Sequence, residues 1–268
     1  MAMAGGSLGA LAAFAVALAD EARAMLVAAA ATRPALEVKP DRSFVTDLDR
    51  AVELRLRELI TDRFPAHGVI GEEGGPPVVG ELTWVLDPID GTAAFIAGMP
   101  VYGTLIALLD GATPVIGVID LPSTSDRWIG IAGQATRHAT RHGADPCATR
   151  RCPALAEAIL SASNPDFFSD AERPALAAMQ AATAWRIYGG ACRAYGLLAS
   201  GRTDLAIDTR LQLWDYAPFV PIIEGAGGII TDWQGRRLTM TSGPQILAAG
   251  DPARQREALV LVEKALSS

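Results

Sequence analysis

Residues 84–100, WVLDPIDGTAAFIAGMP, decide the fold of this chain. They begin with Trp84-Val85-Leu86, an apolar run typical of the end of a buried strand. Asp87 and Asp90 follow this run, and a segment with helix-forming residues comes after Thr92. Hard cations such as Mg²⁺ prefer carboxylate oxygens as ligands. Two aspartates three residues apart at a strand end therefore predict a metal site.

The turn after these aspartates is expected to open a helix. At its start, the free backbone N–H groups of Gly91 and Thr92 would make an anion site. Pro88 stiffens the bend, and Gly91 lets the backbone approach a ligand closely. Metal carboxylates beside the start of a helix indicate phosphate chemistry.

Composition excludes several classes of protein. The chain has 268 residues, of which 50% are hydrophobic and 20% charged, so it suits one large or two modest globular domains. Its net charge of −7 argues against a nucleic-acid-binding surface, so we expect any phosphate to be bound through metal ions. Its three cysteines favour reduced thiols in a cytoplasm.

An apolar segment lies near the N-terminus, at residues 8–19. No basic residue precedes it, which argues against a signal peptide. It is also shorter than the roughly 20 residues that a membrane span needs. We expect it to form part of a long helix over residues 8–32 that packs on the core, with no membrane contact.

Hydrophobic periodicity divides the chain into two halves, 1–150 and 151–268. In the first half it predicts helices and an antiparallel sheet, with helices at 8–32 and 51–60 and strands at 68–70, 84–86, 103–109, 114–119 and 127–132. In the second half strands alternate with helices, which indicates α/β layers. The strands are expected at 156–162, 185–188, 204–208, 228–232 and 246–249, and the helices at 170–182, 192–200 and 213–225.

Two local patterns have competing interpretations. Asp47 and Asp49 precede the second helix, and a capping role is the first interpretation for either one.

Residues 136–152 contain two histidines and two cysteines, His138, His142, Cys147 and Cys152, which form a possible set of zinc ligands. Their spacing matches no compact zinc pattern, so we expect a solvated loop between the halves.

Three separated motifs together resemble the inositol monophosphatase family. They are Gly71-Glu72-Glu73, the segment 87–92 (DPIDGT), and Trp214-Asp215 followed by 224–228 (EGAGG), with 45–49 (VTDLD) as a fourth. Their order and spacing cover about residues 39–251. Other segments resemble the histidinol-phosphate phosphatases within the family, at 101–108, 126–130, 164–168, 188–201 and 248–252.

The resemblance implies an α/β fold, a layered α-β-α-β-α sandwich, and a lithium-sensitive, usually dimeric Mg²⁺-dependent phosphomonoesterase with two or three ions. The first half would carry most metal ligands, and the second would supply Asp215 and the substrate contacts. The metal ligands it implies are Glu72, Asp87, the backbone carbonyl of Ile89, Asp90 and Asp215. Asp49 and Thr92 would orient and deprotonate the attacking water, which leaves Asp47 as a surface acid. Gly91 and Thr92 would bind phosphate, and the substrate contacts would be Gly189, Gly190, Ala191 and Asp208.

Two departures from the histidinol-phosphate enzymes bear on the substrate. Ala93-Ala94 stands where that subgroup usually carries a basic or polar residue, and Ala191 stands where it is expected to carry an aspartate. Asp208 could serve instead, or it could be a strand-end surface acid. The predicted activity is hydrolysis of histidinol phosphate, with inositol monophosphate and 3′-phosphoadenosine 5′-phosphate as rival substrates. The alternative from another class is a non-catalytic regulator that binds metal or phosphate.

Overall fold

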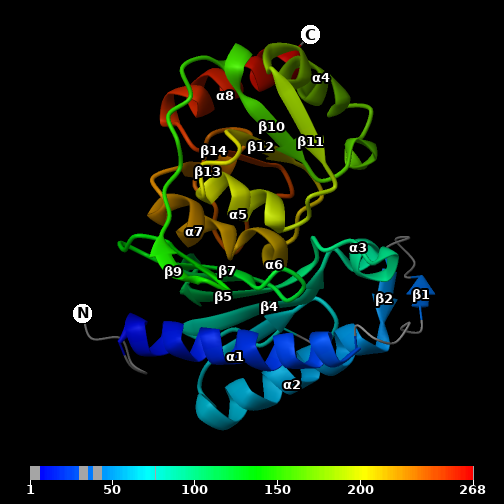
Figure 1. Cartoon of the computed structure of the whole chain (residues 1–268), viewed down its shortest axis with the longest axis vertical. Helices are drawn as coiled ribbons and strands as arrows, with labels where there is room; N and C mark the ends of the chain where they lie inside the picture. Colours follow the sequence, from blue (N-terminus) through cyan, green and yellow to red (C-terminus); the bar gives the residue numbers. More distant parts are fainter. Residues whose placement is uncertain (1–6, 30–35, 39–43, 76, 268) are drawn as a thin grey trace.

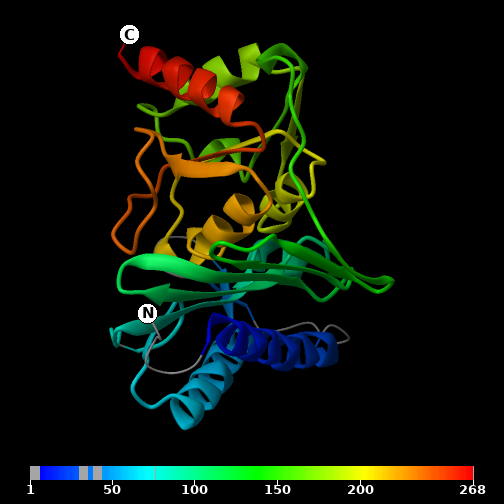
Figure 2. The ribbon, with the colours of Figure 1, turned by 90° about the vertical axis from the view of Figure 1, so that its left-hand side faces the viewer.

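The computed structural model describes residues 7–29, 36–38, 44–75 and 77–267. Its helices and strands stack in an α-β-α-β-α order, which is visible from two directions (Figure 1, Figure 2). This stacking confirms the predicted layered α/β fold.

Two helices cover the outer face of the first sheet, α1 (Leu8–Ala29) and α2 (Asp47–Arg63). The buried residues of α1 include Leu11, Ala15, Leu18 and Ala22, a spacing that forms one apolar stripe along a helix. This stripe packs on the sheet together with α2. The predicted end of the first helix, at residues 30–32, lies outside the described residues. A short antiparallel pair, β1 (Leu36–Val38) and β2 (Phe44–Thr46), precedes α2.

The first sheet has seven strands in the order β3-β4-β5-β6-β7-β8-β9. Their bounds are β3 (Gly68–Gly71), β4 (Leu82–Asp90), β5 (Gly103–Asp110), β6 (Thr113–Leu121), β7 (Asp126–Ile131), β8 (Arg137–Thr140) and β9 (Gly143–Pro146). The predicted hairpin of β5 and β6 is confirmed. The predicted antiparallel sheet is confirmed from β4 to β9, whereas β3 pairs with β4 in parallel. The parallel alignment brings the C-terminal end of β3 beside the same end of β4.

The expected loop at 136–152 is partly wrong, because it contains the hairpin of β8 and β9. β8 pairs with β7, and the ring of His138 in β8 stacks on Trp128 in β7 with the ring centroids 4.3 Å apart. All four residues of β9 are exposed, so the hairpin has no apolar alternation that would reveal it in the sequence. From β9 the chain runs past the middle layer of helices to the second sheet (Figure 1).

Three helices fill the layer between the sheets, α5 (Arg193–Ala199), α6 (Leu213–Tyr216) and α7 (Phe219–Gly225). The single helix predicted over 213–225 is divided at Pro218, which has no N–H to continue the helical hydrogen bonds. The helix layer lies very close to β6. A Cβ atom on Gly117 would lie 2.0 Å from the carbonyl oxygen of Pro218.

The second sheet has five strands in the order β11-β10-β12-β14-β13. They are β10 (Ile159–Ala162), β11 (Trp185–Tyr188), β12 (Leu205–Asp208), β13 (Ile229–Asp232) and β14 (Ile246–Ala249). Its outer face carries α4 (Arg173–Ala182) and the unpredicted α8 (Pro252–Leu266). The start of the strand predicted at 156 is instead the 3₁₀ helix η1 (Leu155–Glu157), and a second one, η2 (Pro165–Phe167), follows β10.

One apolar core joins the two halves. The rings of Tyr195 and Phe219 stack 3.9 Å apart, in a cluster that also contains Leu105 and Ile119 from the first sheet. The predicted boundary at 150/151 falls between β9 and η1, and the status of the halves as separate domains stays a prediction. Among the described helices, none has the length and apolar character to cross a membrane.

Candidate metal centre

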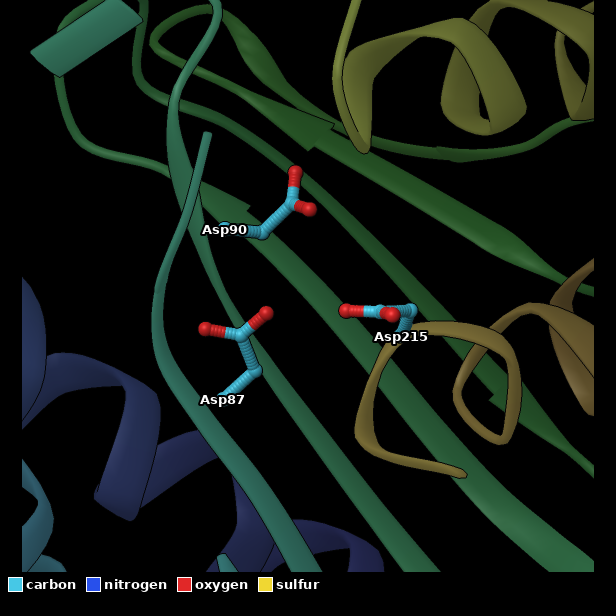
Figure 3. Close-up of side chains that lie close together, drawn as sticks. All are labelled: Asp87, Asp90 and Asp215. Atoms are coloured by element: carbon cyan, nitrogen blue, oxygen red, sulfur yellow. The ribbon is translucent and has the colours of Figure 1, made fainter. Parts of the chain in front are cut away.

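Strand β4 delivers Asp87 and Asp90 to one end of the first sheet. Residues three apart on a regular strand face opposite sides. Here Asp87 pairs with Leu105 and Asp90 with Gly103, so three steps along β4 match two along β5. This irregularity re-aims the strand, as β-bulges do. Both carboxylates consequently reach the same space (Figure 3).

Asp215 enters that space from α6. One carboxylate oxygen from each of Asp87, Asp90 and Asp215 lies within 4.8 Å of the other two. Figure 3 shows the three side chains gathered between β4 and α6. The orientation of Asp215 is fixed by the backbone N–H of Gln212, which donates to its Oδ2 atom at 2.6 Å.

Glu72 lies beside this group. It follows β3, and its backbone N–H donates to the carbonyl of Leu86, the residue before Asp87, at 3.2 Å. The negative charge of Glu72 helps to raise the pKa of both Asp87 and Asp215. The parallel pairing of β3 and β4 therefore brings Glu72 close enough for its charge to act on Asp87 and Asp215.

The burial of these acids and the repulsion between their charges favour a bound cation. Burial raises the pKa of Asp87 and of Asp215 well above the ordinary range, and repulsion between neighbouring carboxylates adds to the effect. Burial also raises the pKa of Asp90, against hydrogen bonds from Cys192. The Oδ1 atom of Asp87 is buried with no hydrogen-bond partner among the described residues. Buried carboxylates carry a large desolvation cost unless they are paired or bind metal. This all-oxygen donor set fits a divalent ion such as Mg²⁺.

Asp49 and Thr92 meet at the edge of the group. The hydroxyl of Thr92 donates to the carbonyl of Ile89 at 3.0 Å and lies 3.4 Å from Oδ1 of Asp49. The Oδ2 atom of Asp49 accepts from the backbone N–H of Thr46 at 2.8 Å and from its hydroxyl at 2.5 Å. Asp49 therefore bonds the N-cap residue of α2, Thr46, and also faces Thr92, while the neighbouring Asp47 is exposed as expected.

Thr46 has a role that the sequence analysis did not assign. Thr46 and Asp49 form a capping box, a pattern in which each side chain bonds the backbone N–H of the other. The Thr-x-x-Asp spacing was available as a signal. Burial raises the pKa of Asp49, and the hydrogen bonds from Thr46 oppose this shift.

The turn at Gly91 packs against the segment between β11 and α5. Gly91 precedes α3 (Thr92–Ala97) with a φ of 78°, in the left-handed region that favours glycine. A Cβ atom at Gly91 would lie 2.9 Å from that of Ala191. Ala191 itself has a φ of 44°, and it follows Gly189 and Gly190 in the same segment. The predicted phosphate-binding turn at Gly91 therefore lies next to the segment 189–191, which contains three of the predicted substrate contacts.

Asp208 is buried, with 2% of its surface exposed, so its interpretation as a surface acid is wrong. Its Oδ1 atom accepts from the backbone N–H of Ser163 at 2.6 Å, and its Oδ2 atom accepts from the hydroxyl of Tyr195 at 2.8 Å. Burial raises the pKa of Asp208 to about 6. Its contact with substrate stays a prediction, and sequence reasoning missed Ser163 and Tyr195 as its partners.

The alternative zinc site is not formed by the part of the chain that the structure describes. There, Asp87, Asp90 and Asp215 are the only group of three or more metal-ligating side chains. His138 instead pairs with Asp126, with Nε2 and Oδ1 2.9 Å apart.

Comparison with known families identifies the group to which the chain belongs. The model of the inositol monophosphatase family matches residues 8–266. The chain belongs to the inositol monophosphatase family.

Individual members of the inositol monophosphatase family resemble the chain over most of its length. The bifunctional phosphatase IMPL2, chloroplastic, of Arabidopsis thaliana is 40% identical over 235 residues, which are 84% of this chain and 67% of that protein. The histidinol-phosphatase of Mycobacterium tuberculosis is 36% identical over 207 residues, 75% of this chain and 78% of that one. The structure of an inositol monophosphatase from Zymomonas mobilis matches with a TM-score of 0.86 at 35% identity, covering 96% of this chain and 99% of that one.

Membership of the inositol monophosphatase family makes the chain a phosphatase, a hydrolase of phosphomonoesters. The family acts on small phosphorylated substrates and depends on metal ions, generally Mg²⁺.

Proposed function

We propose that this phosphatase hydrolyses histidinol phosphate to histidinol, a step of histidine biosynthesis, in an Mg²⁺-dependent reaction. The observation that carries the metal dependence is the convergence of Asp87, Asp90 and Asp215 from two distant parts of the chain. The choice of substrate is supported by the 36% identity to a histidinol-phosphatase. The homodimeric state implied by the family resemblance and the cytoplasmic location expected from the cysteines belong to the same proposal.

The metal ligands in this proposal are Glu72, Asp87, the carbonyl of Ile89, Asp90 and Asp215. These residues would hold two or three Mg²⁺ ions, which would supply charge neutralisation for the phosphoryl group and activation of the attacking water. The chain's own contribution is positioning, which dominates phosphoryl transfer. Asp87 and Asp90 are fixed by the irregularity in β4, and Asp215 is fixed by the N–H of Gln212.

Proton transfer falls to Thr92 and Asp49 in this proposal. The Oδ2 atom of Asp49 is occupied by two donors from Thr46, which leaves Oδ1 facing the hydroxyl of Thr92. A proton from the attacking water can pass to Oγ1 of Thr92 as that hydroxyl gives its own proton to Oδ1 of Asp49. Burial raises the pKa of Asp49, which brings it nearer to the range of an effective general base.

In this proposal the part of the substrate beyond the phosphoryl group contacts the second half of the chain. Gly91 and Thr92 bind the phosphoryl oxygens through backbone N–H groups, and Gly189, Gly190 and Ala191 border the leaving alcohol. The contact between Gly91 and Ala191 supports this arrangement, because it puts both segments at one place. Asp208, held by Tyr195, contributes its negative charge toward the ammonium group of histidinol phosphate.

Phosphate release from a panel of substrates tests this proposal. Histidinol phosphate, inositol 1-phosphate and 3′-phosphoadenosine 5′-phosphate are each assayed with Mg²⁺ and with EDTA. We expect the highest kcat/KM for histidinol phosphate, and no turnover in EDTA. If another substrate has the highest kcat/KM, that substrate replaces histidinol phosphate in the proposal. No turnover of any substrate would favour the non-catalytic regulator.

A further inference from the structure

Helix α2 carries two charged residues in line with Asp49. Glu53 and Arg57 follow it at steps of four, a spacing that places side chains on one helix face. Glu53 is only 1% exposed, which is unusual for a glutamate unless it is paired. Neither residue belongs to the predicted metal ligands or to the catalytic pair.

Glu53 uses both carboxylate oxygens inside the protein. Its Oε1 atom accepts from Nε of Arg57 at 2.7 Å, and its Oε2 atom accepts from the backbone N–H of Glu73 at 2.7 Å. Arg57 in turn donates from Nη2 to the carbonyl oxygen of Gly74 at 2.5 Å. The pair therefore binds the backbone of the two residues that follow Glu72.

The residue before Glu72 is held as well. A Cβ atom at Gly71 would lie 2.3 Å from Oε1 of Glu53, so any side chain there would collide with the carboxylate. At Gly74 the corresponding distance is 3.0 Å. The backbone on both sides of Glu72 therefore packs against Glu53.

The same helix holds Asp49 at its first turn, where its carboxylate faces Thr92. An α-helix is a stiff rod with a fixed rise of about 1.5 Å per residue. One rigid element therefore sets the position of Asp49 and, through Glu53 and Arg57, the position of the loop that carries Glu72.

We propose that Glu53 and Arg57 form a clamp that positions Glu72 for metal binding. They are positioning residues, because they act through the loop and touch no reacting atom. The inference rests on the proposed function, in which Glu72 is a metal ligand.

The clamp requires a carboxylate at position 53. Its two donors, Nε of Arg57 and the N–H of Glu73, each need an acceptor. Glutamine has the same shape but offers one acceptor and one NH₂ group, so one of these donors would be left facing another donor. A buried donor without a partner is strongly unfavourable. Glu53→Gln is therefore the sharpest substitution.

Calorimetric titration of the purified full chain with Mn²⁺, without substrate, tests the clamp directly. Loss of a residue that orients a metal ligand typically weakens metal affinity about 10- to 100-fold. We expect an increase of that size in the Kd of Mn²⁺ for Glu53→Gln. Glu58→Gln is the matched control on the same helix, because Glu58 is exposed and pairs only loosely with Arg55, at 3.6 Å. Its Kd should equal that of the wild type.

Activity supplies a second readout. For Glu53→Gln, the Mg²⁺ concentration that gives half the maximal rate should rise about 10-fold or more. At saturating Mg²⁺ the KM for substrate should stay within about twofold of wild type, because the clamp acts on metal binding and lies away from the substrate contacts.

Two results would overturn the clamp. The first is an unchanged Kd in Glu53→Gln; if its unfolding temperature in EDTA is also lower, the pair only supports the fold. If Glu53→Gln does not fold, Arg57→Lys replaces it, since lysine keeps the charge but loses the fork that reaches both Glu53 and Gly74. An unchanged Kd in Arg57→Lys is the second. A wild-type chain that binds no Mn²⁺ would refute the proposed function as well, so the two failures are distinguishable.

Discussion

The Oδ2 atom of Asp90 accepts a hydrogen bond from the backbone N–H of Cys192 at 2.6 Å. Asp90 ends β4 in the first sheet, and Cys192 immediately precedes α5 in the layer between the sheets. The candidate metal centre therefore lies at the junction of two layers, and both layers contribute groups to it. A small movement between the layers would displace Asp90, a proposed metal ligand.

Asp90→Asn should abolish turnover while the fold remains. Asparagine keeps an oxygen that can accept from Cys192 but loses the charge that a cation needs. Metal ions contribute several kcal/mol to transition-state stabilisation, so we expect kcat to fall by about 10³-fold or more. Phosphate release measures the effect, and Asp47→Asn, at an exposed acid, is the control. A rate near that of the wild type would reject Asp90 as a metal ligand.

Thr92→Val should slow the chemical step, because it removes the hydroxyl that lies between Ile89 and Asp49. Loss of a group that transfers protons costs about 10²- to 10⁴-fold in kcat. Thr92→Ser keeps the hydroxyl and should stay within about tenfold of wild type. Measurements of kcat at saturating Mg²⁺ compare the two variants. Equal rates for valine and serine would exclude a proton-transfer role for this hydroxyl.

Asp208 should make the metal-free protein less stable as pH rises. Burial raises its pKa from 3.8 to about 6, so the folded state binds this proton more tightly than the unfolded state does. Its contribution to stability is full below about pH 4 and is lost as pH rises through about 6. The shift corresponds to about 3 kcal/mol.

Asp208→Asn cannot titrate, so the difference in unfolding free energy between wild type and variant should change by about 2 kcal/mol between pH 4 and pH 7. Urea denaturation in EDTA at both pH values measures it. Parallel pH profiles for the two proteins would contradict the buried, protonatable state of Asp208.

Mg²⁺ should stabilise the fold more at pH 7.5 than at pH 5. The pKa values of Asp87 and Asp215 are raised well above the ordinary range, so protons compete with the cation at the lower pH. At a free Mg²⁺ concentration of about 100 times the Kd, stabilisation should reach about 2.7 kcal/mol. Thermal unfolding at both pH values tests this, with Asp90→Asn as the control that should respond weakly. A pH-independent response in the wild type would count against binding at these acids.

Gly117→Ala should destabilise the junction between the layers. Its new Cβ atom would lie 2.0 Å from the carbonyl of Pro218, so the helix layer must shift away from β6. Overpacking of this kind costs about 1–3 kcal/mol. Gly243→Ala is the control, because a Cβ atom there meets nothing within 4 Å. Urea denaturation should separate the two variants, and equal stability would contradict the close packing at β6.

Sequence signals were strongest where structure is decided locally. The end of β4, the turn at Gly91 and the hairpin of β5 and β6 are all marked by residues within a few positions of one another. The two carboxylates of β4 and the helix after them were predictable for this reason. Helix α8 was also predictable, because Asp251 caps it and Pro252 occupies its first turn, although we did not predict it.

Long-range placement could not be predicted from local patterns. The parallel pairing of β3 with β4 depends on the path of the connecting segment, which no local pattern reveals. Glu53 has the sequence context of a solvated helix residue, but in the fold it is buried and lies against the loop at Gly71. Asp208 is buried by contact with Tyr195 and Ser163, which are distant in the sequence. The meeting of Asp215 with β4 was expected only from the family resemblance.

Anomalous diffraction from crystals grown with Mn²⁺ tests the central claim most directly, because it locates the ions themselves. We predict anomalous density in direct contact with carboxylate oxygens of Asp87, Asp90 and Asp215, and its loss at that place in Asp90→Asn. A protein that hydrolyses phosphate monoesters with Mn²⁺ but shows no anomalous density among these three residues would contradict the account.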